Sequence, residues 1–140
     1  MAAAASVGGA RDAWGSGIGW LDYDNDGDLD ILECACGQAP RLLRNESAKG
    51  PHWGRLTLKG TTSNRDAIGA EVTLVVGGKK QTRLVMPTRS DQSQWEKTVT
   101  FGLGANDRIE SATIRWPGGR GQKLESVRVD RVVTVQQSAQ

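Results

Sequence analysis

Acidic side chains alternate along residues 22–30, and this spacing is typical of a calcium-binding loop. Calcium takes six to eight oxygen ligands, and loops supply them from positions 1, 3, 5, 7 and 9, with a backbone carbonyl serving at position 7. We therefore predict a Ca²⁺ site in this acidic segment. Its ligands would be the carboxylates of Asp22, Asp24, Asp26 and Asp30 and the carbonyl of Asp28.

Two other residues of the acidic segment also fit such a loop. Gly27 stands at position 6, where the chain must turn sharply and where a left-handed backbone costs glycine little. Leu29 stands at position 8, where an apolar side chain can anchor the loop to a core. A solvated acidic turn would account for the charge, but it would not account for the spacing or for the glycine.

The same segment also matches the EF-hand pattern, because Glu33 falls on position 12. An EF-hand needs a helix on each side of its loop. Three glycines stand at positions 15, 17 and 19, and each costs about 1 kcal/mol relative to Ala in a helix. Residues 29–36 partly alternate and are soon followed by Gly37 and Pro40, which favours a strand. We expect the loop to lie between strands.

Residues 19–31 resemble a repeat of the FG-GAP/VCBS type, and residues 41–45 resemble the strand that closes such a repeat. In these repeats the D-x-D-x-D-G-x-x-D loop of a propeller-blade hairpin holds calcium. The chain has one copy. The resemblance implies that residues 1–50 form a single blade-like unit that carries the calcium loop.

The rest of the chain resembles the ASPIC/UnbV domain, which follows such repeats. The resemblance rests on His52-Trp53, residues 58–70, residues 101–104 and residues 115–120. Residues 86–97 depart from the family, which has a Gly-rich stretch there. The resemblance implies that residues 51–140 form a non-catalytic domain of an extracellular or periplasmic calcium-binding protein.

Strand periodicity runs through the C-terminal part. Residues 55–59, 71–74 and 111–116 alternate cleanly, and turn signals such as Gly77-Gly78 separate them. We expect further strands at residues 81–85, 97–101, 123–128 and 131–135. We predict an all-β fold, in which a hairpin or single blade-like unit packs on a C-terminal β-sandwich or small barrel. The expected core comprises Leu56, Leu58, Val72, Leu74, Val99, Phe101, Ala112, Ile114, Trp116, Val133 and Val135.

Composition restricts the class of partner. The net charge is +2, yet seventeen of the eighteen Lys and Arg residues follow Cys34, along with only nine of the sixteen acids. A basic body can bind polyanions, but these residues are dispersed at outward-facing strand positions, which favours a solvated face. Nothing matches a nucleic-acid motif, and no segment is apolar and long enough to span a membrane. A protein or glycan partner is expected, and the N-terminal hairpin also offers a contact for a homo-oligomer.

The first residues lack the charge and the apolar core of a signal peptide. Either a signal was removed or the chain is a piece of a longer secreted protein, and the single repeat favours the second. A hairpin this small is marginal alone, so we expect Trp14 or Trp20 to be buried against the sandwich or against another chain.

Other chemistry-bearing residues are few. Cys34 and Cys36 fall on one face of a strand, too extended for an easy mutual disulfide. They could join a partner chain or bind a soft metal, and we expect small buried thiols. Trp95, in the departing segment, is the candidate for ligand stacking. His52, the only histidine, would be the general base of an alternative function, a calcium-dependent ester or phosphoester hydrolase.

Overall fold

The computed structural model of the chain describes residues 15–46, 50–90 and 93–139. These residues form strands and loops, and none of them lies in a helix. The prediction of an all-β fold is confirmed. The described chain therefore holds no helix of the length and apolarity that crossing a membrane requires.

The N-terminal sheet has three antiparallel strands in the order β1-β2-β3. These are β1 (Gly15–Leu21), β2 (Asp30–Ala35) and β3 (Arg41–Leu43). Leu21 pairs with Asp30, so the acidic segment makes the connection between β1 and β2. Strands flank the loop on both sides, as expected, and the arrangement of an EF-hand is excluded.

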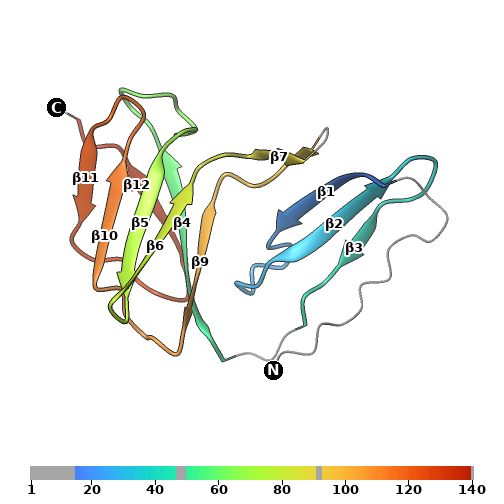
Figure 1. The fold of residues 1–140 in the computed structure, drawn as a ribbon, viewed down its shortest axis with the longest axis horizontal. Coiled ribbons are helices and arrows are strands. Elements are labelled where there is room, and N and C mark those ends of the chain that lie inside the picture. Colours follow the sequence, from blue (N-terminus) through green and yellow to red (C-terminus); the bar gives the residue numbers. More distant parts are fainter. Residues whose placement is uncertain (1–14, 47–49, 91–92, 140) are drawn as a thin grey trace.

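The C-terminal part contains a four-stranded and a three-stranded sheet (Figure 1). One has the order β11-β10-β5-β6, and the other has the order β12-β4-β9. Strand β12 runs parallel to β4, whereas the other pairs of both sheets are antiparallel. The strands are β4 (His52–Lys59), β5 (Glu71–Val76), β6 (Lys79–Leu84), β9 (Val99–Gly104), β10 (Ser111–Arg115), β11 (Gly121–Leu124) and β12 (Val132–Gln136).

One apolar core joins these two sheets. Leu74 and Ile114 reach it from one sheet, Leu56 and Phe101 from the other, and all four are fully buried. The sheets therefore pack face to face as a β-sandwich, and neither closes into a barrel within the described chain. The predicted core is buried except for Val133, which packs against it and is partly buried. The strand expected at residues 123–128 is shorter, because β11 ends at Leu124.

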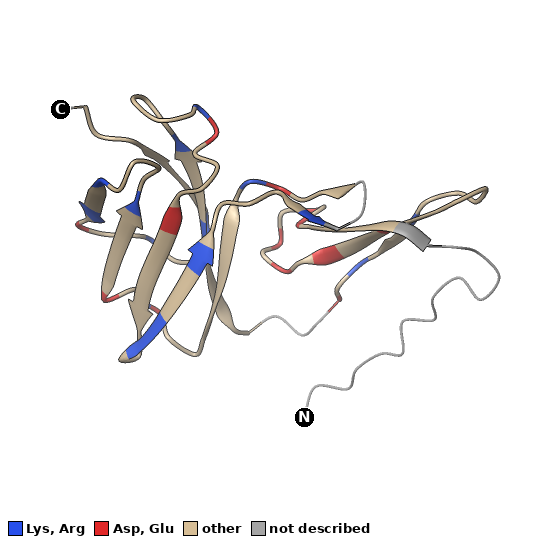
Figure 2. Cartoon of the chain, turned by 45° about the horizontal axis from the view of Figure 1, so that its top comes forward, with Lys and Arg blue, Asp and Glu red and all other residues tan. Residues whose placement is uncertain are grey.

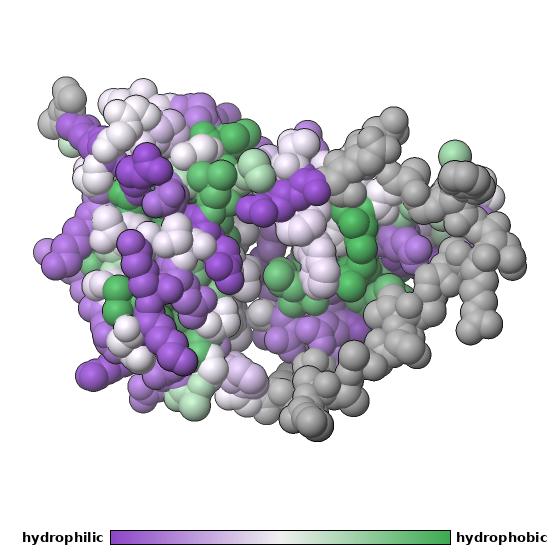
Figure 3. Space-filling view, in the orientation of Figure 1, coloured by the Kyte–Doolittle hydropathy of each residue, from purple (hydrophilic) through white to green (hydrophobic). Residues whose placement is uncertain are grey.

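The segment that departs from the family pattern forms a short hairpin. Strands β7 (Thr88–Ser90) and β8 (Ser93–Gln94) pair antiparallel and both contact β1. Figure 1 shows β7 reaching from the sandwich toward the N-terminal sheet. The acids of the N-terminal hairpin loop lie on the side nearer the sandwich, and Lys and Arg occupy both ends of β6 (Figure 2). The space-filling surface is hollowed between the two parts (Figure 3).

The prediction of small buried thiols is wrong. Cys34 and Cys36 are both exposed. Cys34 lies near the end of β2, and this end points away from the sandwich (Figure 1). Among the residues of this sheet whose exposure is described, the buried one is Asp30, which lies at the end that meets the sandwich and is only 2% exposed.

Candidate metal centre

The backbone of the acidic segment turns where the sequence predicts. Gly27 has a φ of 96° and Asn25 a φ of 61°, both in the left-handed region that side chains rarely adopt. Gly27 is also pressed against the sandwich. A Cβ placed on it would lie 2.1 Å from the nearest atoms of the Trp53 indole. Glycine is therefore required here by the backbone conformation and by the close approach of Trp53.

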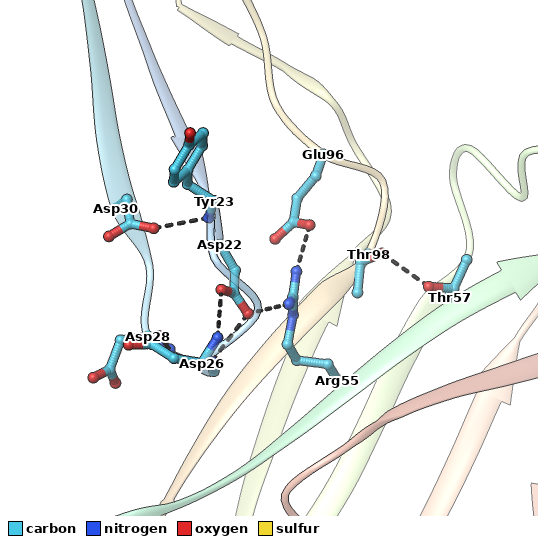
Figure 4. A network of polar contacts seen from close by, with 10 residues as sticks. Asp22, Tyr23, Asp26, Asp28, Asp30, Arg55, Thr57, Glu96 and Thr98 are labelled. Atoms are coloured by element: carbon cyan, nitrogen blue, oxygen red, sulfur yellow. Dashed lines mark hydrogen bonds and ion pairs between the residues drawn. The ribbon is translucent and has the colours of Figure 1, made fainter. Parts of the chain in front are cut away.

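Asp22, at the first position of the loop, is buried and organises the turn. Its Oδ1 accepts a hydrogen bond from the N–H of Asp26 at 3.1 Å. Its Oδ2 accepts one from the N–H of Gly27, also at 3.1 Å. The carboxylate of Asp22 therefore holds the loop closed (Figure 4).

Asp30, at the ninth position, anchors the loop to two other segments. Its Oδ2 accepts a hydrogen bond from the N–H of Tyr23 and its Oδ1 one from the N–H of Asn45, both at 2.8 Å. The residue is almost fully buried. Asp30 thus connects the start of the loop with the chain that follows β3.

Three of the predicted ligands come together. Asp22, Asp24 and Asp30 each offer one carboxylate oxygen, and these oxygens lie within 4.8 Å of one another. Asp24 is exposed and also pairs with Arg44 at 2.7 Å. The carboxylate of Asp26 is not in this group, and its Oδ1 accepts a hydrogen bond from the N–H of Asp28 at 3.0 Å.

Negative charge is crowded in the loop. Burial raises the pKa of the Asp28 carboxyl above its usual range, and the nearby carboxylates, led by Asp26 and Asp22, raise this pKa further. Like charges held this close destabilise one another, and a bound cation would offset the repulsion. The ion pair between Asp24 and Arg44 already offsets part of this repulsion.

A buried arginine, missed in the sequence, meets the loop from the sandwich. Arg55 of β4 is 3% exposed, and its guanidinium pairs with Asp22 on one side and with Glu96 on the other, the latter at 2.5 Å (Figure 4). Burial raises the pKa of Glu96, and this effect outweighs the opposing attraction of Arg55. The prediction that the basic residues face outward into solvent is wrong for Arg55, because the hairpin covers that face of β4.

His52 is engaged elsewhere. Its Nδ1 lies 2.6 Å from Oδ2 of Asp130, and Oδ1 of Asp130 accepts a hydrogen bond from the N–H of Trp53 at 3.1 Å. The hydrogen bond with His52, followed by that from Trp53, lowers the pKa of Asp130. Asp130 is not one of the predicted calcium ligands, so these contacts do not assemble the hydrolytic site in which His52 would serve as a base.

Trp95, the candidate for ligand stacking, lies at the junction of the two parts. Its ring centroid is 6.3 Å from that of Trp20, the rings are tilted by 60°, and its Nε1 donates to the carbonyl of Ile18 at 3.1 Å. Trp20 thus packs against the C-terminal part, although it is half-buried rather than buried. Trp14 lies outside the described residues.

Comparison with known proteins identifies the C-terminal part. A family model described as ASPIC and UnbV matches residues 60–140, which is more than half of the chain. The acidic segment and Arg55 precede the matched residues. No match was found among curated proteins.

Proposed function

The chain belongs to the ASPIC and UnbV family, and we propose that it is a calcium-binding module of a larger secreted protein. Domains of this family are typically found in extracellular or periplasmic proteins. The module has a structural or adhesion-like binding role and no catalytic one. In this proposal residues 1–50 are an FG-GAP/VCBS-like repeat, and residues 51–140 are the ASPIC/UnbV-like β domain.

The observation that carries the proposal is the grouping of three carboxylates at loop positions 1, 3 and 9. Calcium prefers hard oxygen ligands from a loop of this spacing. Asp22 accepts two backbone hydrogen bonds and pairs with Arg55, and Asp30 accepts two backbone hydrogen bonds. A carboxylate has about four lone-pair sites, so these bonds leave capacity for an ion. The donor set therefore fits calcium, and Asp26 and the carbonyl of Asp28 are the further ligands in this proposal.

The ion would stabilise a small structure. A three-stranded sheet has little core of its own, and the N-terminal sheet depends on contacts such as that between Gly27 and Trp53. An ion that binds only the folded loop stabilises the fold by mass action, by about 2.7 kcal/mol at a hundredfold excess over its dissociation constant. Calcium would thus fix the hairpin in the position in which it meets the sandwich.

Calorimetry tests this proposal directly. We expect the melting temperature to rise with Ca²⁺ and to fall with EGTA, and titration calorimetry to detect one calcium ion per chain. Mg²⁺ should substitute poorly, because it demands a smaller octahedral shell. The control variant is Asp107→Asn, which removes an exposed acid far along the sequence and should leave both measurements unchanged. Equal melting temperatures in calcium and in EGTA would contradict the proposal.

A further inference from the structure

A pocket of about 200 Å³ lies where the N-terminal hairpin meets the sandwich. Trp20 and Leu29 line it from the hairpin, and residues 83–86, 89 and 95–100 line it from the C-terminal part. Pockets for drug-sized ligands measure about 300–1,000 Å³. This pocket is smaller, so its size suits a single ring or one residue of a longer chain.

Two indole rings border the pocket. Trp20 and Trp95 are both half-buried and face each other at a tilt. The N–H of Trp95 is already donated to Ile18. Arg89 covers one face of the Trp95 ring, so Trp95 offers a ligand the rest of its apolar ring surface rather than a hydrogen-bond donor, and such a surface packs well against the C–H groups of another ring.

Two arginines of the pocket make few polar contacts with the residues that the structure describes. Arg83 lies over the ring of Phe101 at 5.5 Å, and Arg89 lies over the ring of Trp95 at 5.6 Å. Each guanidinium donates to one backbone carbonyl, at 3.1 Å and 3.4 Å respectively. Within the described chain neither is part of an ion pair, whereas Lys97 in the same pocket is held by Asp66 at 2.6 Å.

A guanidinium has five N–H donors in a planar fork, which matches the geometry of a carboxylate or a similar oxyanion. The aromatic rings hold both guanidinium groups in place without neutralising them. The pocket therefore presents two positioned cations, and the charge that complements it is negative.

We propose that this pocket binds one anionic sugar residue of an acidic glycan, a pyranose that carries a carboxylate or a sulfate. The sugar ring packs against the indoles, and its anionic group meets Arg83 and Arg89. A shallow depression that shares Arg89 and Trp95 adjoins the pocket and leaves room for the neighbouring sugars. This inference rests on the binding role proposed above and does not require calcium to be a ligand of the sugar.

An acidic peptide would satisfy the arginines but would leave the other features unexplained. A short Asp or Glu side chain presents no ring to two facing indoles. Apolar residues border the hollow between the two parts, which suits an amphipathic ring better than an extended acidic chain (Figure 3).

Titration calorimetry on the full chain tests the inference with three trisaccharides and one peptide, each of defined charge. The arms are trigalacturonate for the carboxylate, a sulfated maltotriose for the sulfate, maltotriose as the neutral sugar, and triglutamate as the acidic peptide. We expect at least one anionic sugar to bind ten or more times more tightly than maltotriose and triglutamate, and to change tryptophan fluorescence.

Variants identify the site. Arg83→Gln and Arg89→Gln should each weaken anionic sugar binding at least tenfold, while the matched control Lys80→Gln, an exposed cation of the same strand β6, should weaken it less than twofold. Trp95→Phe keeps an aromatic face and should weaken binding less than Trp95→Ala. Calcium titration and the melting temperature of each variant show that the fold and the acidic loop are intact.

Three results would overturn the inference. They are no binding of either anionic sugar, equal loss of binding in Lys80→Gln and Arg89→Gln, and triglutamate binding that matches sugar binding and depends on the same arginines. The first two would leave the calcium proposal standing if calcium still raises the melting temperature, so the two failures can be told apart.

Discussion

Arg55 and Asp22 form a buried ion pair that crosses from the sandwich to the acidic loop. The side chain of Arg55 is 3% exposed and that of Asp22 is fully buried. Asp22 is also the residue whose carboxylate closes the loop through the N–H groups of Asp26 and Gly27. The first predicted calcium ligand is therefore also the residue through which the loop is tied to β4.

Replacing Arg55 should be strongly destabilising. Removing one partner of a buried ion pair typically costs about 3–5 kcal/mol, because the other charge stays buried without compensation. We expect a loss of this size in the free energy of unfolding of Arg55→Met, measured by urea denaturation in EGTA. The control is Arg115→Met, which removes an exposed pair with Glu71 and should cost about 0–1 kcal/mol. Equal losses of stability in Arg55→Met and Arg115→Met would show that the Arg55 pair is not the main connection between β4 and the acidic loop.

Gly27→Ala tests the contact between the loop and Trp53. Any non-glycine residue at this positive φ costs about 1–2 kcal/mol, and the Cβ would in addition overlap the Trp53 ring. Overpacking of this kind costs about 1–3 kcal/mol more. Denaturation should therefore show a larger loss of stability in Gly27→Ala than in the control Gly37→Ala. Gly37 has a φ of 76°, but the space around its Cβ position is open. A difference near zero would mean that the loop does not rest on Trp53.

The strands of the sandwich could be predicted from the sequence because one face of each is buried. Along β5, Val72, Leu74 and Val76 are buried and alternate with half-buried residues, so the period of two is visible. The same reasoning failed for Arg55. Alternation along β4 correctly placed Leu56 and Leu58 in the core, but it carries no information on what covers the other face. Asp22 lies 33 residues away in the sequence, and only the folded chain brings it to Arg55.

The loop itself was the most predictable part of the candidate site. The spacing of its acids, its glycine and its place between strands follow from local chemistry, and the backbone at Gly27 agrees. The pocket beside it was not predictable, because it is assembled from the hairpin and from β6, β9 and the β7–β8 segment. The β7–β8 strands have three and two residues, too few to show a period.

Calcium affinity should separate the ligands of the loop from the acid at position 12. Asp24→Asn removes an exposed carboxylate of the group of three, so it should weaken calcium binding at least tenfold with little effect on the fold. Glu33 lies in β2 and pairs with Arg41 at 3.6 Å. Glu33→Gln should therefore change calcium affinity less than twofold in titration calorimetry. An equally damaging Glu33→Gln would reject the blade-type loop.

Low pH should weaken the junction between β4 and the chain before β12, because the carboxylate of Asp130 becomes protonated. The hydrogen bond with His52, and then that from Trp53, hold the pKa of Asp130 below its ordinary value of 3.8. For an acid with a lowered folded pKa, the stabilising contribution is complete above the unfolded pKa and is lost as the pH falls through the folded pKa. The carboxylate thus stabilises the fold at pH 5 and progressively less as the pH falls below 3.8.

Asp130→Asn should therefore be less stable than the parent at pH 5, and the difference should shrink at pH 3. The measurement is urea denaturation at both pH values in EGTA, which keeps calcium out of the comparison. Because His52 is the first cause of the shift, the effect of Asp130→Asn should also be smaller in a His52→Phe background. A stability difference that stays the same at both pH values, with or without His52, would show that Asp130 is not held as a carboxylate by these contacts.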